Sequence, residues 1–203
     1  MKEYRLEELG IGEIPLLIQR QVATYPERIH RHDAIEIVYI EHGSGWCAVN
    51  GIIHPMLTGD LYIIPVGATH EFYSDAPLKY INLIFKDTIF HESEHFLKEN
   101  FSTSHHEDML DKYTFGPHLQ SEINEKINQI SGELNSAEPH AKIRSRLLFI
   151  DFLIFLIRNA VLAPGIRSSH AQIHLGKVLC YISLPRASSP SSTERASGPW
   201  ATL

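Results

Sequence analysis

The sequence predicts a mainly β domain followed by a C-terminal α-helical segment. Short runs rich in β-branched and aromatic residues alternate with turn signals over about residues 15–86. From about residue 117 the apolar residues recur at helical spacing, and the last twenty residues show no apolar period. We therefore expect three parts: a β-barrel in residues 1–115, a helical and linker segment in 116–183, and a disordered Ser/Pro-rich tail in 184–203.

Five short runs account for the predicted strands of the first part. They cover residues 34–40, 46–49, 52–57, 61–64 and 80–85. Asn50-Gly51 lies between two of them, and this dipeptide favours a tight hairpin because both residues accept a positive φ. Five short strands with tight turns in about 70 residues indicate a sandwich or a small barrel.

Two amphipathic helices are predicted after the strands. The first carries a narrow apolar stripe at three- and four-residue steps, formed by Leu119, Ile123, Ile127 and Ile130. The second follows Pro139, and its stripe alternates four- and three-residue steps through Ile143, Leu147, Ile150, Ile154, Ile157 and Val161. Leu148, Phe152 and Phe155 widen this stripe. We expect the second helix to cover the barrel with one face and to form a homodimer with the other; an internal core helix of a monomer is the alternative. A third, shorter pattern covers residues 173–182.

Composition limits the function classes. The chain has 203 residues, is 43% hydrophobic and has a formal net charge of −6, without the Lys/Arg-rich face expected of a DNA-binding domain. Two widely spaced cysteines indicate a reducing compartment. The N-terminus does not resemble a signal peptide, and the apolar run 147–157 is too short to cross a bilayer. We expect a soluble cytoplasmic protein without membrane association.

Candidate metal ligands concentrate in two segments. His30, His32 and Glu36 share a period of two, so on one extended strand they would project from the same face. Two imidazoles and a carboxylate on one face can hold a divalent transition metal. In the second segment, GDLYIIPVGATH, a Gly-Asp turn leads through an apolar strand and a Pro/Gly bend to His70.

These two segments resemble the paired motifs of the cupin family, HxHxxxE followed by a glycine and then GxxxxxPxGxxH. Thr24 stands where the first motif usually has a leading glycine, and Ser74 stands where the second usually has an asparagine. The resemblance implies a double-stranded β-helix, which is a small jelly-roll barrel. It also implies a metal set of His30, His32, Glu36 and His70, for which Zn, Ni, Fe and Mn are the candidates. Polar lining without a metal is the alternative role for these four residues.

The resemblance narrows to the N-terminal domains of AraC-type transcriptional regulators, including those that sense arabinose and rhamnose. It covers about residues 15–183 and is carried by HRHDAIEIVYIEHGSGWCAVNG, GDLYIIPVGATHEFYSDAPLKYINLIF and HLGKVLCYIS. It implies a small effector in the barrel, a dimer through the helices, and DNA contact only through a C-terminal helix-turn-helix domain. That domain should begin near residue 184, where the Ser/Pro tail stands instead. An ordinary flexible tail and a truncated or frame-shifted gene remain open as explanations.

The effector pocket can be outlined from the barrel residues. The predicted ligand-binding residues are Glu36, Trp46, Tyr62, His70, Phe72 and Asn82, with Tyr73 as a further aromatic candidate. Tyr39 is out of phase with Glu36 and is expected on the outer face, whereas Trp46 is expected in the core if it does not contact ligand. No catalytic residue is predicted. The alternative function is a metal-dependent cupin enzyme, either a dioxygenase or a sugar isomerase, that uses the same four ligands.

Overall fold

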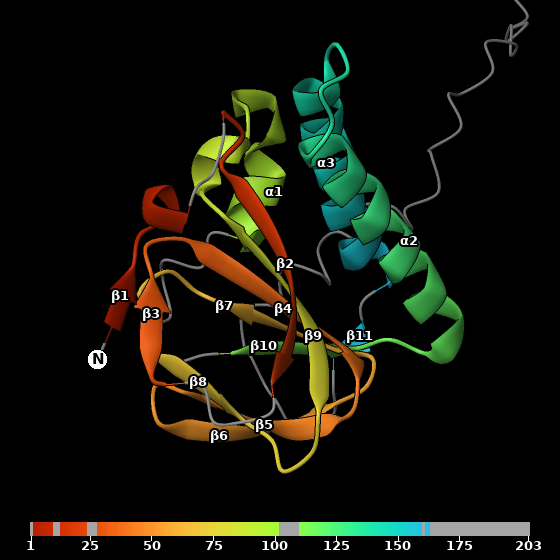
Figure 1. Cartoon of the computed structure of the whole chain (residues 1–203). Coiled ribbons are helices and arrows are strands. Elements are labelled where there is room, and N and C mark those ends of the chain that lie inside the picture. The colour runs from red at the N-terminus through yellow and green to blue at the C-terminus, as the bar shows by residue number, and fades with distance from the viewer. Residues whose placement is uncertain (1, 10–12, 24–27, 102–109, 160, 163–203) are drawn as a thin grey trace, which may run out of the picture.

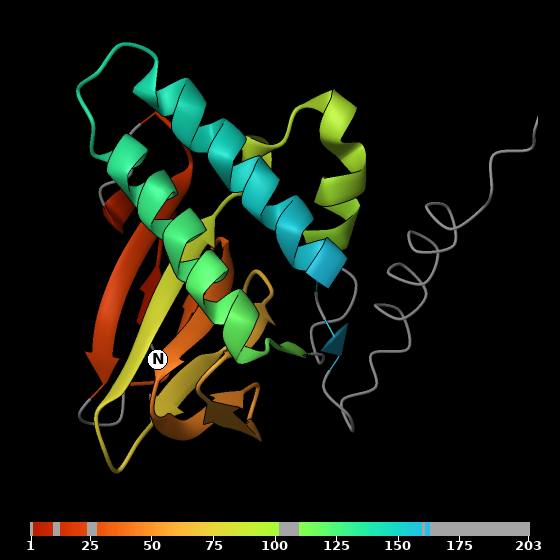
Figure 2. The same ribbon diagram turned by 90° about the vertical axis from the view of Figure 1, so that its right-hand side faces the viewer.

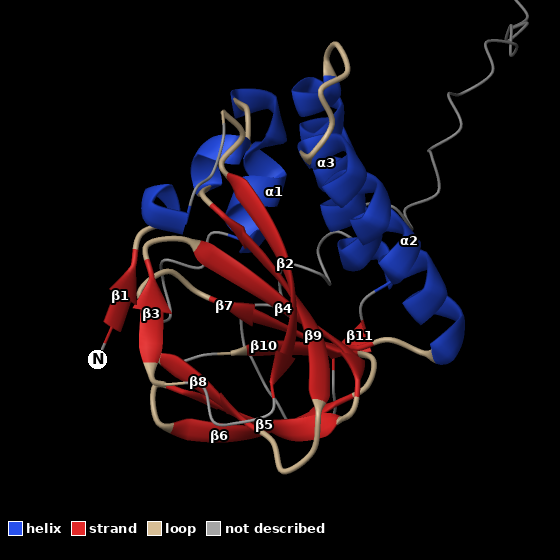
Figure 3. Ribbon diagram, in the orientation of Figure 1, coloured by secondary structure: helices blue, strands red, loops and turns tan. Residues whose placement is uncertain are grey.

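The computed structural model describes residues 2–9, 13–23, 28–101, 110–159 and 161–162. The predicted third helix over 173–182 and the predicted tail over 184–203 lie outside these residues. Strands form a barrel, and helices gather on one side of it (Figures 1 and 3). This arrangement confirms the predicted mainly β barrel of the cupin type followed by helices.

Two sheets make up the barrel. The five-stranded sheet has the order β1 (Lys2–Tyr4), β3 (His30–His32), β8 (His70–Tyr73), β5 (Ser44–Val49) and β6 (Ile52–Leu57). The six-stranded sheet has the order β11 (Val161–Leu162), β10 (Asp111–Thr114), β7 (Asp60–Ile64), β4 (Ile35–His42), β9 (Leu78–Phe85) and β2 (Leu16–Ala23). Strand β1 pairs with β3 in parallel, and the other described pairs are antiparallel.

Each of the five predicted runs contains a strand, and the predicted hairpin is confirmed. Asn50 and Gly51 have φ angles of 47° and 82°, and they connect β5 to β6 in the register that pairs Val49 with Ile52. The sequence analysis did not identify strands β1, β2, β10 and β11 or the short helix α1 (His95–Phe101). Val161 was predicted at the end of the second helix, but this helix, α3 (Ala141–Asn159), ends at Asn159 and Val161 lies in β11. Three 3-10 turns complete the described elements: η1 (Leu6–Leu9), η2 (Asp87–Ile89) and η3 (Glu92–Glu94).

Side-chain alternation divides the six-stranded sheet into two faces. On β4, Val38 and Ile40 belong to the cluster that fills the barrel, together with Tyr62 and Phe72. The alternate residues, including Tyr39, belong to a second cluster that packs against the helices. Tyr39 therefore lies on the outer face of the barrel, as predicted from its phase.

Helices α2 (Pro117–Leu134) and α3 (Ala141–Asn159) lie side by side over the outer face of the six-stranded sheet (Figure 2). Helix α2 buries Ile123, Ile127 and Ile130. Helix α3 buries one face against the sheet with Phe149, Phe152, Leu153 and Leu156. Its predicted stripe divides, because Ile150 is buried whereas Ile143, Leu147 and Ile154 are 60%, 55% and 39% exposed. None of the described helices combines the length and apolar character needed to cross a membrane.

Candidate functional site

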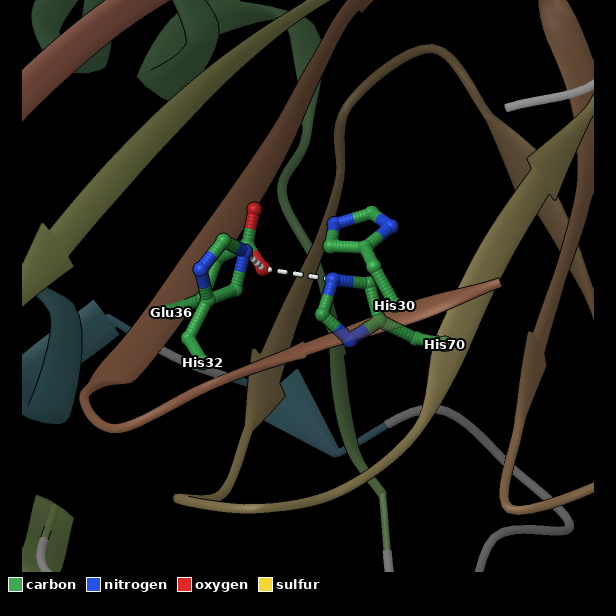
Figure 4. A group of neighbouring side chains, drawn as sticks. All are labelled: His30, His32, Glu36 and His70. Atoms are coloured by element: carbon green, nitrogen blue, oxygen red, sulfur yellow. Dashed lines mark ion pairs between the residues drawn. The ribbon is translucent and has the colours of Figure 1, made fainter. Parts of the chain in front are cut away.

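Four predicted metal ligands meet inside the barrel. His30 and His32 come from β3 and His70 from β8, whereas Glu36 comes from β4 in the opposite sheet (Figure 4). One ligand atom from each residue lies within 4.8 Å of the others, and all four side chains are buried. Among the described residues, three imidazoles and one carboxylate therefore surround a common point.

The route by which these residues converge differs from the prediction. His30, His32 and Glu36 do not lie on one extended strand, because β3 ends at His32 and β4 begins at Ile35 in the other sheet. The chain crosses between the sheets at Asp33 and Ala34. Closure of the barrel, rather than a common strand phase, places Glu36 opposite the histidines. The direct pairing of His30 with His70 across β3 and β8 adds the fourth ligand.

Backbone carbonyls orient two of the imidazoles. Nδ1 of His30 lies 2.9 Å from the carbonyl oxygen of Arg28, and Nδ1 of His70 lies 3.2 Å from that of Ala68. A carbonyl oxygen can only accept a hydrogen bond, so each Nδ1 carries the proton and each neutral ring keeps a lone pair on Nε2. This is the second-shell arrangement that prepares histidine to bind a metal.

The carboxylate completes a donor set that suits a cation. Oε2 of Glu36 lies 2.8 Å from Nε2 of His70 and 3.4 Å from Nε2 of His32. When His70 is neutral with its proton on Nδ1, two lone pairs face each other across 2.8 Å. Either a second proton on His70 or a cation between the two groups relieves this repulsion. Three nitrogen donors and one oxygen donor fit a divalent transition ion.

Two pKa shifts favour the metal-binding protonation states. Burial alone would raise the pKa of Glu36, but His70, His32 and His30 outweigh it and hold this pKa below its ordinary value. Burial also lowers the pKa of His32. Near neutral pH the site therefore offers an ionised carboxylate and a neutral His32, which are the forms that bind metals.

The N-terminal strand contributes a residue that sequence reasoning missed. Tyr4 of β1 stacks on His32 with ring centroids 5.7 Å apart and meets His30 edge-on at 5.3 Å. The backbone N–H of Asp33 donates to the Tyr4 carbonyl, and the Asp33 carboxylate accepts from the N–H of Leu6. A three-residue strand paired with residues about thirty positions later leaves no local pattern in the sequence.

The predicted ligand-binding residues do not all lie together. Phe72 is buried in the barrel, with its ring 5.7 Å from that of His70. Tyr62 is also buried, but its hydroxyl donates to the carbonyl of Pro55 and lies 3.3 Å from Asp60. Asn82 lies on the inner face of β9 and is 7% exposed.

Trp46 departs from the prediction that it lies in the core. It is 52% exposed, and it pairs with Tyr73 and Pro55 on the face of β5 opposite to buried Cys47. Strand alternation therefore places Trp46 on the outside of the barrel, away from Glu36 and the histidines.

A second buried polar group lies inside the barrel and was not predicted. Nζ of Lys112 lies 2.7 Å from Asp60 and donates to the carbonyl of Pro55 at 3.0 Å. Asp60 also accepts from Thr114 and from the backbone of Leu57. Lys112 and Asp60 both belong to the six-stranded sheet, whereas Pro55 and Leu57 belong to the five-stranded sheet, so the hydrogen bonds between these two pairs join the sheets.

Comparison with known proteins agrees with this geometry. Residues 17–153 match the family described as the AraC-like ligand binding domain. The chain is 35% identical over 74 residues to the HTH-type transcriptional activator RhaR of Mannheimia succiniciproducens; this match covers 36% of the chain and 27% of RhaR. The chain thus spans about a quarter of the length of this curated relative.

Solved structures show lower similarity. A cupin-2 domain containing protein from Shewanella frigidimarina is 18% identical with a TM-score of 0.34, over 36% of this chain and 72% of that one. Oxalate decarboxylase from Bacillus subtilis is 19% identical with a TM-score of 0.34, over 39% of this chain and 23% of the enzyme. Since the family match extends over more than half of its length, this chain belongs to the family of AraC-like ligand binding domains.

Proposed function

We propose that the chain is the effector-sensing and dimerisation part of an AraC-type transcriptional regulator. In this proposal a small molecule, for which a sugar is one candidate, binds in the barrel and controls transcription. DNA contact would come from a separate helix-turn-helix domain, as the name of the relative RhaR suggests, and the protein would act in the cytoplasm. Family membership over residues 17–153 carries this proposal.

We also propose that His30, His32, Glu36 and His70 bind one divalent transition metal, with Zn, Ni, Fe and Mn as candidates. The support is the convergent donor set and the short distance between Glu36 and His70. A bound ion would supply a Lewis-acidic anchor for an effector oxygen. If no metal binds, the same four residues would hydrogen-bond the effector directly.

Dimerisation is proposed to occur through α3. Ile143, Leu147 and Ile154 form an exposed apolar row on this helix, while the opposite face of α3 is covered by the sheet. Exposed apolar surfaces of this kind mark interfaces in soluble proteins. A second copy of the same row would cover it.

A metal-dependent cupin enzyme is the second candidate, because a His3Glu centre also suits catalysis. Native mass spectrometry of the full chain, purified from metal-replete culture and mixed with a sugar panel, distinguishes the two functions. We expect a dimer with one metal per chain that binds one panel member and leaves it unchanged. Conversion of a sugar by the metal-loaded chain would favour the enzyme, and a monomer that binds neither metal nor any panel member would contradict the proposed function.

A further inference from the structure

Three buried oxygens inside the barrel accept no hydrogen bond from the part of the chain that the structure describes. They are Oδ1 of Asn82 and both carboxylate oxygens of Glu36, of which Oε2 faces Nε2 of His70. Glu36 is fully buried and Asn82 is 7% exposed. A buried acceptor without a donor destabilises the fold, so each such atom requires a specific explanation.

Strand register places the two residues on one face. Glu36 lies opposite Ile84, and Val38 lies opposite Asn82 in the β4–β9 pair. Residues directly opposite in an antiparallel pair share a face, as do residues two apart on one strand. Asn82 and Glu36 are therefore diagonal neighbours on the inner face, with Cα atoms about 7–8 Å apart.

The surroundings of Asn82 are largely apolar. Val38 opposite it and Tyr80 two residues earlier both belong to the cluster that fills the barrel. The polar neighbour in register on the other side is Gln19 of the edge strand β2. The amide oxygen of Asn82 accepts no hydrogen bond from the described residues, so it does not stabilise the fold in the way that a leucine of similar shape would by packing.

We infer that Asn82 is a second anchor for the barrel ligand, accepting a hydrogen bond from a hydroxyl group whose neighbouring oxygen reaches the centre at Glu36. This inference rests on the proposed function. Because Asn82 and Glu36 are diagonal neighbours on one face, a ligand that reaches both residues would present a pair of oxygens on adjacent carbons. The ligand class is therefore a small molecule with such a pair, either a vicinal diol of a sugar or an α-hydroxycarboxylate.

The first test uses stability. Asn82→Leu removes the unpaired acceptor at nearly constant shape, so the Tm of the ligand-free full chain should rise by roughly 2–4 °C. Asn124→Leu on α2 is the matched control for the binding test that follows, because Oδ1 of Asn124 is also buried without a hydrogen-bond partner but belongs to a helix outside the barrel. A fall in Tm for Asn82→Leu would show that Asn82 supports the fold and would overturn the inference.

The second test measures binding to the full chain loaded with Co2+, whose visible absorption reports changes in its ligands. Two matched pairs serve as probes: lactate with propionate, and D-ribose with 2-deoxy-D-ribose. The hydroxylated member of one pair should bind about tenfold more tightly, which corresponds to about one hydrogen bond. The pair that shows the preference identifies the source of the hydroxyl.

The variants then assign that preference to Asn82. Asn82→Leu should abolish it, and Asn124→Leu should preserve it. Persistence of the preference in Asn82→Leu, or equal binding of the two members of each pair by the wild type, would overturn the inference. A wild-type chain that binds neither Co2+ nor any of the four probes would instead contradict the proposed function, so the two failures are distinguishable.

Discussion

The exposed row on α3 provides a prediction whose size follows from the structure. The exposed parts of Ile143, Leu147 and Ile154 on two copies together amount to about three whole side chains, and complete burial contributes about 1.5–3 kcal/mol for each. A dimer through this row would therefore gain roughly 5–9 kcal/mol of transfer free energy before the cost of association. Replacing Leu147 and Ile154 by Glu removes most of this gain, so the dissociation constant of the dimer should rise at least about a hundredfold.

Sedimentation velocity combined with circular dichroism measures this effect. The double variant should be a folded monomer at concentrations where the wild type is a dimer, because both side chains project away from the sheet-facing core of α3. Ile53→Glu on β6 is the control, since Ile53 is 65% exposed on a different part of the barrel and its replacement should leave the dimer intact. A double variant that remains dimeric, or a wild type that is monomeric at micromolar concentration, would refute the reasoning.

Three further predictions concern the barrel. Tyr4→Ala should weaken Zn2+ binding several-fold in chelator competition, because the ring contact that orients His32 is lost. Tyr4→Phe keeps the ring and should bind Zn2+ as tightly as the wild type; equal affinity of all three proteins would contradict the role of Tyr4 in orienting His32. In thermal melts the metal-free chain should lose stability as pH falls. The unfolded chain protonates His32 near pH 6.5 and Glu36 near 4.5, whereas both folded pKa values are lower, so Tm should drop from pH 7 to 4 and a flat profile would refute the assignment. Lys112→Met should reduce the free energy of unfolding in urea by about 3–5 kcal/mol, because Asp60 is left as a buried charge without its ion-pair partner. Adding Asp60→Asn should restore part of this loss, and a Lys112→Met variant as stable as the wild type would show that the ion pair does not stabilise the fold.

Features that depend on neighbouring residues in the chain could be predicted from the sequence. The Asn50-Gly51 hairpin follows from two residues that accept positive φ, and alternation on β4 correctly separated Tyr39 from Glu36. The motif spacing identified four residues that converge, although the reason given for their convergence was wrong. His32 and Glu36 meet because the chain passes from one sheet to the other between them.

Features that depend on the pairing of distant segments could not be predicted from local sequence patterns. Tyr4 lies at the site because β1 pairs in parallel with β3, and Lys112 lies beside Asp60 because β10 pairs with β7. Trp46 was expected in the core because of its size, but its phase on β5 is set by the neighbouring strands β6 and β8. On α3, the helical period alone could not indicate that Ile150 would be buried while Leu147 stayed exposed.

The buried centre formed by three histidines and Glu36 is the site at which the metal and the effector are proposed to bind. Titration of the full chain with Co2+, followed by visible absorption, tests it most directly. We predict saturation at one ion per chain with visible absorption bands, and loss or a shift of those bands in folded His70→Gln. Absence of saturable binding, or an unchanged spectrum in His70→Gln, would contradict the assignment of this centre as a metal site.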